Sequence, residues 1–235
     1  MSLPILRILS VSAVAVGLRH TVADFQRDTG IKCSVSYQTS TQMRDLDWKQ
    51  PPWDVVITST SLALELSALG AVDLNSALNL GRVGIGLAVH DSCTLIPPQT
   101  TPQLIEALEG ATTVVYNWAS SGHYVESLFD RLGLLPVLAA KTQRVLDGEA
   151  LLKTIAQEPK PGQWVIGLGA VTEILEVKGW GVKLAGILPA DIQHLTAYQA
   201  LATTQSTPQP YVQAFITTLA STKAKALFAS SGVHL

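Results

Sequence analysis

Short apolar runs alternate along the chain with segments whose apolar residues recur at helical spacing. The runs are rich in Val, Ile and Leu, which is typical of strands buried on both faces of a parallel sheet. We expect strands at residues 7–10, 32–37, 54–58, 83–89, 113–117, 163–168 and 182–187. The alternation predicts an α/β fold in which a mainly parallel sheet is flanked by helices.

The segments between the strands end where helices are expected to end. A glycine at the position of a left-handed cap follows five of them, namely Gly30, Gly70, Gly133, Gly179 and Gly232. The first helix carries a stripe of Val14, Leu18, Val22 and Phe25. Residues 8–18 could also be the apolar core of a signal peptide. Because the stripe continues directly from them, a strand followed by an amphipathic helix explains them better.

Two segments indicate a division into two lobes. Residues 81–89 form a glycine-punctuated strand that could cross between lobes, and residues 188–198 form a long loop before a second apolar segment. We therefore expect a discontinuous first lobe, 1–84 plus 196–235, and a second lobe, 85–195, with a ligand cleft between them. Hinges would lie near Gly84–Gly86 and Thr196–Tyr198.

Hydroxyl-rich turns follow four of the expected strands, at residues 10–13, 38–41, 58–61 and 119–122. In open α/β sheets, ligands bind at the carboxyl ends of strands, where helix N-termini offer N–H groups and a partial positive charge. Helix capping by Ser and Thr explains any one of these turns. Four together predict an anion site built from hydroxyls and backbone N–H groups.

The charge content narrows the choice of ligands. Charged residues make up 14% of the 235 residues and the net charge is −2, against about 25% charged in an ordinary soluble protein. Nucleic-acid binding needs a basic face and is therefore excluded. With 47% hydrophobic residues the chain is not disordered, although it has no run of about 18 apolar residues. An anion would be held by neutral donors rather than by Arg or Lys.

The sequence matches known catalytic, metal-binding and cofactor-binding motifs poorly. Ser121 and His123 are close, but no G-x-S-x-G surrounds the serine. The five histidines lack paired metal-ligand spacing. Residues 167–172 imitate a dinucleotide-binding turn, with Thr172 where the third glycine belongs. We expect no catalysis, no metal and no cofactor.

A few single residues remain open. Cys33 and Cys93 do not make a disulfide framework and are expected to be buried thiols. Lys141 and Glu173 are either solvated or helix-dipole charges, or residues of the cleft. Trp118 and Tyr124 flank the turn at 120–122 and either support it or contact the ligand.

The order and spacing of several short motifs carry a family resemblance. They are ADFQRDTG at 23–30, YQTST at 37–41, WDVVITS at 53–59, LSALG at 66–70, SSGHY at 120–124, AGILP at 185–189, TAY at 196–198 and LFASSG at 227–232. The chain resembles the molybdate-binding group of the type II periplasmic binding proteins, as a divergent side branch. The resemblance implies two α/β lobes closing over a small solute that is delivered to an ABC transporter permease.

The resemblance also implies site residues. It places Ser40 as a hydroxyl donor, Ser121-Gly122 as a backbone donor turn and Val145 as a backbone contact. The family's serine after the first strand falls on Ala13, and its late tyrosine falls on Leu168 or Gly169. Together with the hydroxyl turns, the predicted ligand-binding set is Ser10, Ser12, Ala13, Thr39, Ser40, Thr58, Ser59, Ser120, Ser121, Gly122, Tyr124, Val145 and Gly169.

We therefore expect a monomeric solute-binding protein of an ABC-type importer that holds a molybdate- or tungstate-like tetrahedral oxyanion. It would be periplasmic if a signal peptide precedes this sequence, and cytoplasmic otherwise. Two alternatives stay open: a binding protein for a small organic anion or another metabolite, and a cytoplasmic effector-sensing domain of a transcription regulator.

Overall fold

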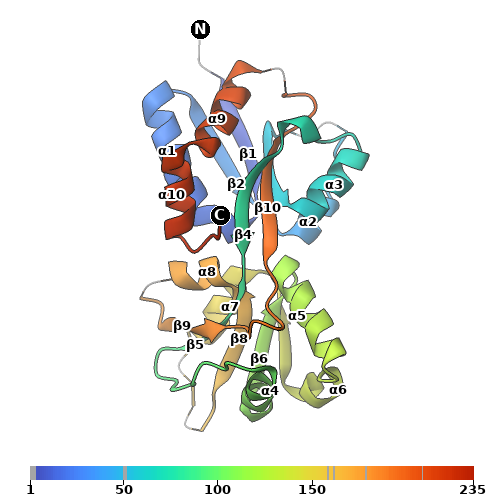
Figure 1. Cartoon of the computed structure of the whole chain (residues 1–235), viewed down its shortest axis with the longest axis vertical. Coiled ribbons are helices and arrows are strands. Elements are labelled where there is room, and N and C mark those ends of the chain that lie inside the picture. The colour runs from blue at the N-terminus through green and yellow to red at the C-terminus, as the bar shows by residue number, and fades with distance from the viewer. Residues whose placement is uncertain (1–3, 50–51, 158, 161, 178, 208) are drawn as a thin grey trace. The chain divides into compact units, whose positions relative to one another are not determined.

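The computed structural model describes residues 4–49, 52–157, 159–160, 162–177, 179–207 and 209–235. Contacts divide the chain into two compact units. Unit 1 comprises the residues up to Val83 together with Thr196–Leu235, and unit 2 comprises Gly84–Leu195. Each unit contains one five-stranded sheet flanked by helices (Figure 1).

The sheet of unit 1 has the strand order β2-β1-β3-β10-β4. Its strands are β1 (Ile5–Ser10), β2 (Lys32–Tyr37), β3 (Val55–Ser59), β4 (Leu78–Val83) and β10 (Thr196–Ala202). β1 pairs in parallel with β2 and with β3, whereas β10 is antiparallel to both β3 and β4. Four of the five strands therefore run in one direction.

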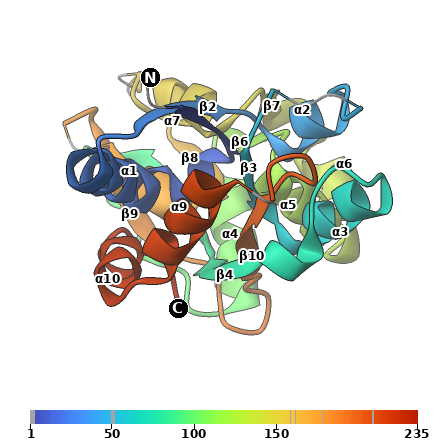
Figure 2. The ribbon, with the colours of Figure 1, turned by 90° about the horizontal axis from the view of Figure 1, so that it is seen from above.

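The helices of unit 1 pack in two groups. α1 (Ala15–Thr29), α9 (Pro210–Ala220) and α10 (Thr222–Ser230) lie side by side (Figure 2). A Cβ at Gly17 would overlap the Phe228 ring, so this glycine lets α1 approach α10 closely. α3 (Thr60–Ala68) packs against β3 and β10, and the short α2 (Ser40–Arg44) follows β2. The turns η1 (Ser12–Val14) and η2 (Leu74–Ser76) are 3-10 helices.

The sheet of unit 2 has the strand order β7-β6-β8-β5-β9. Its strands are β5 (Ile85–His90), β6 (Thr113–Asn117), β7 (Thr142–Val145), β8 (Val165–Ala170) and β9 (Val182–Ile187). β6 is parallel to β7 and β8, and β5 is antiparallel to β8 and β9. The predicted α/β fold with mainly parallel strand directions is confirmed in both sheets.

Two apolar clusters hold unit 2 together. One joins the sheet to α4 (Thr101–Gly110), α5 (Ser120–Arg131) and α6 (Leu135–Leu138), with Leu104 and Phe129 fully buried. The other joins it to α7 (Gly148–Ile155) and α8 (Val171–Glu176) through Leu151 and Ile174. The 3-10 turn η3 (Ala139–Lys141) leads into β7. Helices thus enclose the strands of this sheet, which explains the continuous apolar runs.

One predicted strand needs correction, and two further strands were not predicted. The strand expected at 83–89 is two strands, β4 and β5, separated by Gly84. β7, with the sequence TQRV, is an edge strand, and its polar residues hid it from the apolar pattern. β10 begins at Thr196 inside a segment expected to be a loop, because Thr and Gln interrupt its apolar residues.

The predicted helix ends are confirmed. Gly30, Gly70, Gly133, Gly179 and Gly232 all have φ between 69° and 93°, the left-handed region that favours glycine. Residues 8–18 form the end of β1, η1 and the start of α1, as the strand-and-helix interpretation required. Within the described ranges, no helix is both long enough and apolar enough to cross a membrane.

Candidate functional site

Three of the predicted donor turns lie at one edge of the sheet of unit 1. Because β1, β2 and β3 are parallel, their carboxyl ends share that edge. The Val11 N–H donates to the Ile57 carbonyl (3.1 Å) and the Gln38 N–H donates to the Ser10 carbonyl (3.0 Å). These bonds hold the three turns in register beyond the strands themselves.

Thr58 is the least satisfied of these donors. Its side chain is fully buried, and within the described part of the chain its hydroxyl has no hydrogen-bond partner. The Gln38 Oε1, which follows β2, is also buried without a partner among the described residues. A buried polar group without a partner costs about 1–3 kcal/mol and calls for a specific explanation, such as a ligand or a water molecule.

Other hydroxyls at this edge cap helices. The Thr39 hydroxyl accepts the Gln42 N–H (3.2 Å), while Gln42 Oε1 accepts the Thr39 N–H in return (2.8 Å). The Ser59 hydroxyl accepts the Leu62 N–H at the start of α3 (3.3 Å). An oxygen that accepts in this way keeps its hydroxyl proton for donation. Capping and ligand donation are therefore compatible at these positions.

The remaining predicted residues of unit 1 differ in exposure. Ser10 is fully buried and its hydroxyl donates to the Val11 carbonyl (3.0 Å). Ser12 is exposed at the start of η1, and Ala13 behind it is buried. Ser40 is buried and opens α2. The structure thus brings all the predicted residues of unit 1 to the edge formed by these strand ends.

Asn117 organises the corresponding edge in unit 2. It ends β6, beside Val145 of β7. Its Oδ1 accepts the Ala119 N–H (3.0 Å) and a longer bond from the Ser121 hydroxyl (3.4 Å). Its Nδ2 is buried and has no partner among the described residues. Asn117 was expected only as the last residue of a strand. A buried amide directly before a hydroxyl turn is the signal that could have identified it.

Gly122 is required by this arrangement. A Cβ there would overlap the Asn117 carbonyl oxygen and would lie 2.8 Å from Asn117 Oδ1. The absence of a side chain brings the first turn of α5 directly onto the end of β6. N–H groups in the first turn of a helix have no intrahelical partner, so this turn places the backbone N–H groups of Ser121 and Gly122 at the edge.

Val145 and Gly169 complete the predicted positions at this edge. The Val145 carbonyl accepts the Trp118 N–H (3.0 Å). A Cβ at Gly169 would meet only Leu151, at an ordinary contact distance of 3.5 Å. An alanine methyl group would therefore fit at Gly169, in contact with the core residue Leu151.

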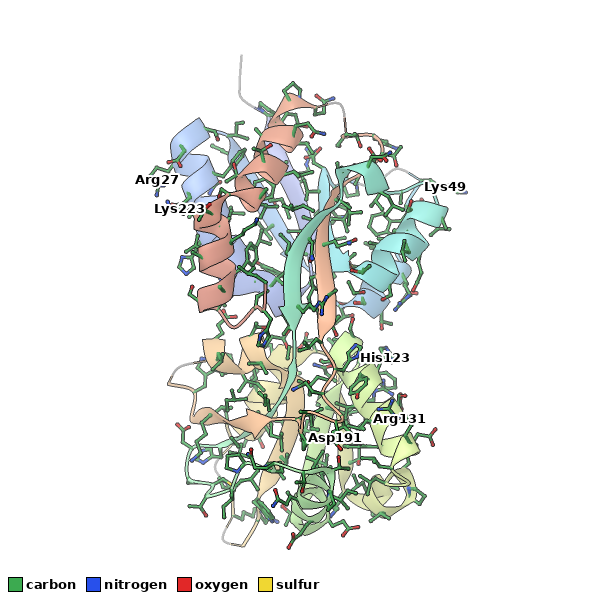
Figure 3. All side chains as sticks on the ribbon, in the orientation of Figure 1. Arg27, Lys49, His123, Arg131, Asp191 and Lys223 are labelled. Atoms are coloured by element: carbon green, nitrogen blue, oxygen red, sulfur yellow. The ribbon has the colours of Figure 1, made fainter. Side chains whose placement is uncertain are left out.

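Tyr124 lies further along α5 and binds a loop of its own unit. Its hydroxyl donates to the Ile192 carbonyl (2.7 Å) and accepts from Arg131 Nη2 (3.1 Å). Its ring stacks on His194 at 4.5 Å, and Figure 3 shows Arg131 on α5 near the loop that carries Asp191. Burial lowers the pKa of His194, helped by the nearby Arg131. This contact supports the helix that presents the donor turn. A ligand contact by Tyr124 stays a prediction.

Arg144 of β7 is a cation that was not among the predicted site residues. Its guanidinium lies 3.3 Å from the centroid of the Trp118 ring, and its Nη1 pairs with Glu126 (2.7 Å). Its Nη2 lies 3.2 Å from Nδ1 of His123. Stacking and pairing of this kind hold a guanidinium in place, so Arg144 supports Trp118 directly before the donor turn.

Lys141 and Glu173, whose roles the sequence did not decide, have different surroundings. The Lys141 ammonium donates to the carbonyls of Glu109 and Ala111 at the end of α4, which is the helix-dipole role. Glu173 is the third residue of α8, and a Cβ on Gly148 would overlap its carboxylate. Burial raises the pKa of Glu173 to about 7, with further contributions from the negative charges of Asp147 and Glu176.

No group of three His, Cys, Asp or Glu within the described ranges could hold a metal ion. Cys33 and Cys93 are free thiols, both half-buried. Burial raises the pKa of Cys33 to about 11, which makes it a poor nucleophile at neutral pH.

Two α/β units with polar turns at the ends of parallel strands define the class of two-lobed solute-binding proteins. The chain belongs to the family of bacterial extracellular solute-binding proteins, whose model matches residues 6–234.

Three similar proteins indicate the range of this class. The periplasmic molybdate-binding protein of Azotobacter vinelandii superposes with a TM-score of 0.79 at 17% identity, over 98% of this chain and 99% of that one. The sulfate-binding protein SubI of Mycobacterium tuberculosis gives a TM-score of 0.76 at 15% identity, over 98% and 86%. An aconitate isomerase of a Pseudomonas species is 26% identical over 97% of this chain and 87% of its own length. The structural neighbours show the binding-protein fold.

Proposed function

We propose that this protein is the solute-binding protein of an ABC-type importer and holds a small tetrahedral oxyanion, such as molybdate or tungstate, at the strand ends described above. The observation that carries the proposal is a pair of fully buried donors at strand ends, Thr58 Oγ1 in unit 1 and Asn117 Nδ2 in unit 2. Neither has a partner among the described residues. An oxyanion bound at such a strand end would supply the acceptor that the buried donor lacks.

The chemistry of these edges supports a fully ionised anion. Apart from the acceptor Gln38 Oε1, the groups at the strand ends of unit 1 are hydroxyls, amides and backbone N–H groups, which donate hydrogen bonds without adding charge. Such donors select by geometry, and they favour a ligand that needs no proton of its own. The first turn of α5 adds N–H groups and a partial positive charge.

Calorimetric titration with molybdate, tungstate, sulfate and phosphate tests the proposal. Both Thr58→Val and Asn117→Asp keep the side-chain shape. Thr58→Val removes the hydroxyl donor, and Asn117→Asp removes the amide N–H donors and adds a carboxylate that repels an anion. We expect at least about tenfold weaker binding from each, since a hydrogen bond to a charged group contributes about 1.5–3 kcal/mol. Thr203→Val is the matched control, because that buried hydroxyl already donates to the Trp53 carbonyl (3.0 Å). An absence of heat from all four anions would contradict the oxyanion proposal.

An organic polycarboxylate is the second candidate. The relative named aconitate isomerase favours it, because its name indicates that it acts on such an acid. Titration with cis-aconitate, trans-aconitate and citrate tests this candidate. Incubation with cis-aconitate, followed by chromatography, would show whether the bound acid is only held or is also converted to its isomer.

We further propose that the protein acts outside the cytoplasm as a monomer and that its partner is the importer's permease. The family description, extracellular solute-binding, supports the location. The gene sequence upstream of this chain tests it: a signal peptide supports transport, whereas a helix-turn-helix segment would support the cytoplasmic sensing alternative.

A further inference from the structure

Glu173 lies in the first turn of α8, the helix that follows the predicted ligand position Gly169. It stands four residues after Gly169, and its carboxylate covers Gly148, which is three residues after Val145. A Cβ on Gly148 would lie only 2.5 Å from the carboxyl carbon of Glu173. The glycine therefore leaves room for this carboxyl at the first turn of α7.

No cation faces this carboxyl from the described residues of the elements around it. The charges that act on it are the carboxylates of Asp147 and Glu176. The titratable groups on the packed elements α7, β5 and β9 have other partners: Lys153 pairs with Glu149 (2.6 Å), His90 lies 2.7 Å from the Ser92 hydroxyl, and Lys183 donates to the Asp91 carbonyl (2.7 Å). An ionised Glu173 is thus uncompensated, and an anion bound nearby would repel it further.

We propose that Glu173 binds the ligand as a carboxylic acid, whose O–H donates to an oxygen of the anion, and that each binding event takes up a proton. The inference rests on the proposed function, since it requires an anion at this edge. The proton comes from the buffer and adds to the Glu173 carboxylate, and no other bond changes. A protonated carboxyl is a neutral donor, like the hydroxyls and amides of the other strand ends.

The raised pKa of Glu173, about 7, supports this assignment because protonation near neutral pH then costs little. If Glu173 had a purely structural role and capped the first turn of α7, its ionised form would be favoured instead. A capping carboxylate is most useful when ionised, and it would exchange no proton when a ligand binds.

Calorimetry at pH 8 in buffers of different ionisation enthalpy measures the protons taken up. The probe is molybdate, or trans-aconitate if only the organic acid binds. We expect uptake approaching one proton, and an affinity that falls up to about tenfold for each pH unit above 7. Glu173→Gln keeps a donor of the same shape and should bind without proton uptake, with an affinity nearly constant from pH 6 to 8.5.

Glu149→Gln is the control, because this exposed carboxylate pairs only with Lys153 on the surface of α7 and should leave the uptake unchanged. Anion binding without proton uptake in the unsubstituted protein would overturn the role of Glu173 and leave the proposed function intact. If none of the anions binds, the proposed function is refuted, and this inference with it.

Discussion

The two sheets have the same architecture but different polar groups at their strand ends. Each contains three parallel neighbours (β2-β1-β3 and β7-β6-β8), then an antiparallel strand, then an edge strand. In unit 1 the parallel strands end in Ser, Thr and Gln side chains. In unit 2 they end beside the Asn117 amide, the Arg144 guanidinium and the Glu173 carboxyl.

This difference predicts that the two units respond differently to pH. Hydroxyls and amides do not titrate near neutral pH, so we expect the contribution of unit 1 to binding to be independent of pH. Unit 2 contains a carboxyl whose pKa is about 7 and should make binding sensitive to pH. Substitutions that affect one unit and spare the other can test this separation.

The largest effect is expected from Gly122→Ala in unit 2. The new methyl group would overlap the Asn117 carbonyl oxygen, so α5 must move away from β6. Backbone displacement by overpacking costs about 1–3 kcal/mol and sometimes more, and we expect about 3 kcal/mol here together with loss of anion binding. Urea denaturation and calorimetry measure the two effects.

Gly169→Ala is the matched control in the same unit, because its methyl group finds ordinary contact distance to Leu151. It should change the free energy of unfolding by less than about 1 kcal/mol. Equal losses in the two variants would show that the close approach at Gly122 has no special importance.

The fold could be predicted from the sequence wherever the pattern was strong. Apolar runs such as Val55–Ser59 and glycines with positive φ such as Gly30 identify themselves locally. β7 could not be found in this way, because an edge strand needs only one paired neighbour and its TQRV sequence has no apolar run. Pairing between distant segments formed that strand, and no local pattern encodes it.

The sequence predicted the type of candidate site, but it did not identify all of the residues. Hydroxyl turns after strands indicated the edges, since strand ends and helix starts follow from the α/β pattern. Asn117 and Arg144 were missed because their importance comes from neighbours distant in sequence: Trp118 stacks on a guanidinium 26 residues later. The surroundings of Glu173 depend on Gly148, which belongs to a different strand–helix turn.

The second largest effect is expected on the pH dependence of the free energy of unfolding, and it arises from Glu173 in unit 2. Below the ordinary pKa of 4.5, Glu173 is protonated in both the folded and the unfolded chain and costs nothing. Between pH 4.5 and 7 the unfolded chain loses this proton while the folded protein keeps it, so the free energy of unfolding falls as pH rises, and above 7 the loss is constant.

Glu173→Gln removes that loss. The variant should be about 1–3 kcal/mol more stable than the parent at pH 8 and equally stable near pH 4.5. Urea denaturation of both proteins from pH 4.5 to 8 measures the difference, in which the other titrating groups cancel. A difference that does not depend on pH would contradict the assigned pKa.

A smaller effect is expected from Thr58→Val in unit 1. The hydroxyl is buried without a partner among the described residues, so its removal should leave the free energy of unfolding unchanged or raise it by about 1 kcal/mol. Thr203→Val removes a hydroxyl that is bonded to the Trp53 carbonyl and should lower it by about 1 kcal/mol. If Thr58→Val lowered stability as much, the hydroxyl would have a partner in the free protein.

The smallest effect on the free energy of unfolding is expected when one tyrosine in each unit is replaced by phenylalanine. Tyr124→Phe in unit 2 keeps the stack on His194 and removes the hydroxyl that donates to the Ile192 carbonyl (2.7 Å), so the loop around Ile192 is held less firmly. Tyr211→Phe in unit 1 removes a longer bond to Asp54 (3.3 Å), and Asp54 still accepts from the Ser206 hydroxyl and the Arg7 N–H. We expect the free energy of unfolding to fall by about 1 kcal/mol in Tyr124→Phe and by about 0.5 kcal/mol in Tyr211→Phe.

Hydrogen exchange tests whether Tyr124 holds the loop. Exchange should increase at residues 192–195 in Tyr124→Phe alone, and an equal increase in both variants would show that the loop is not held by Tyr124.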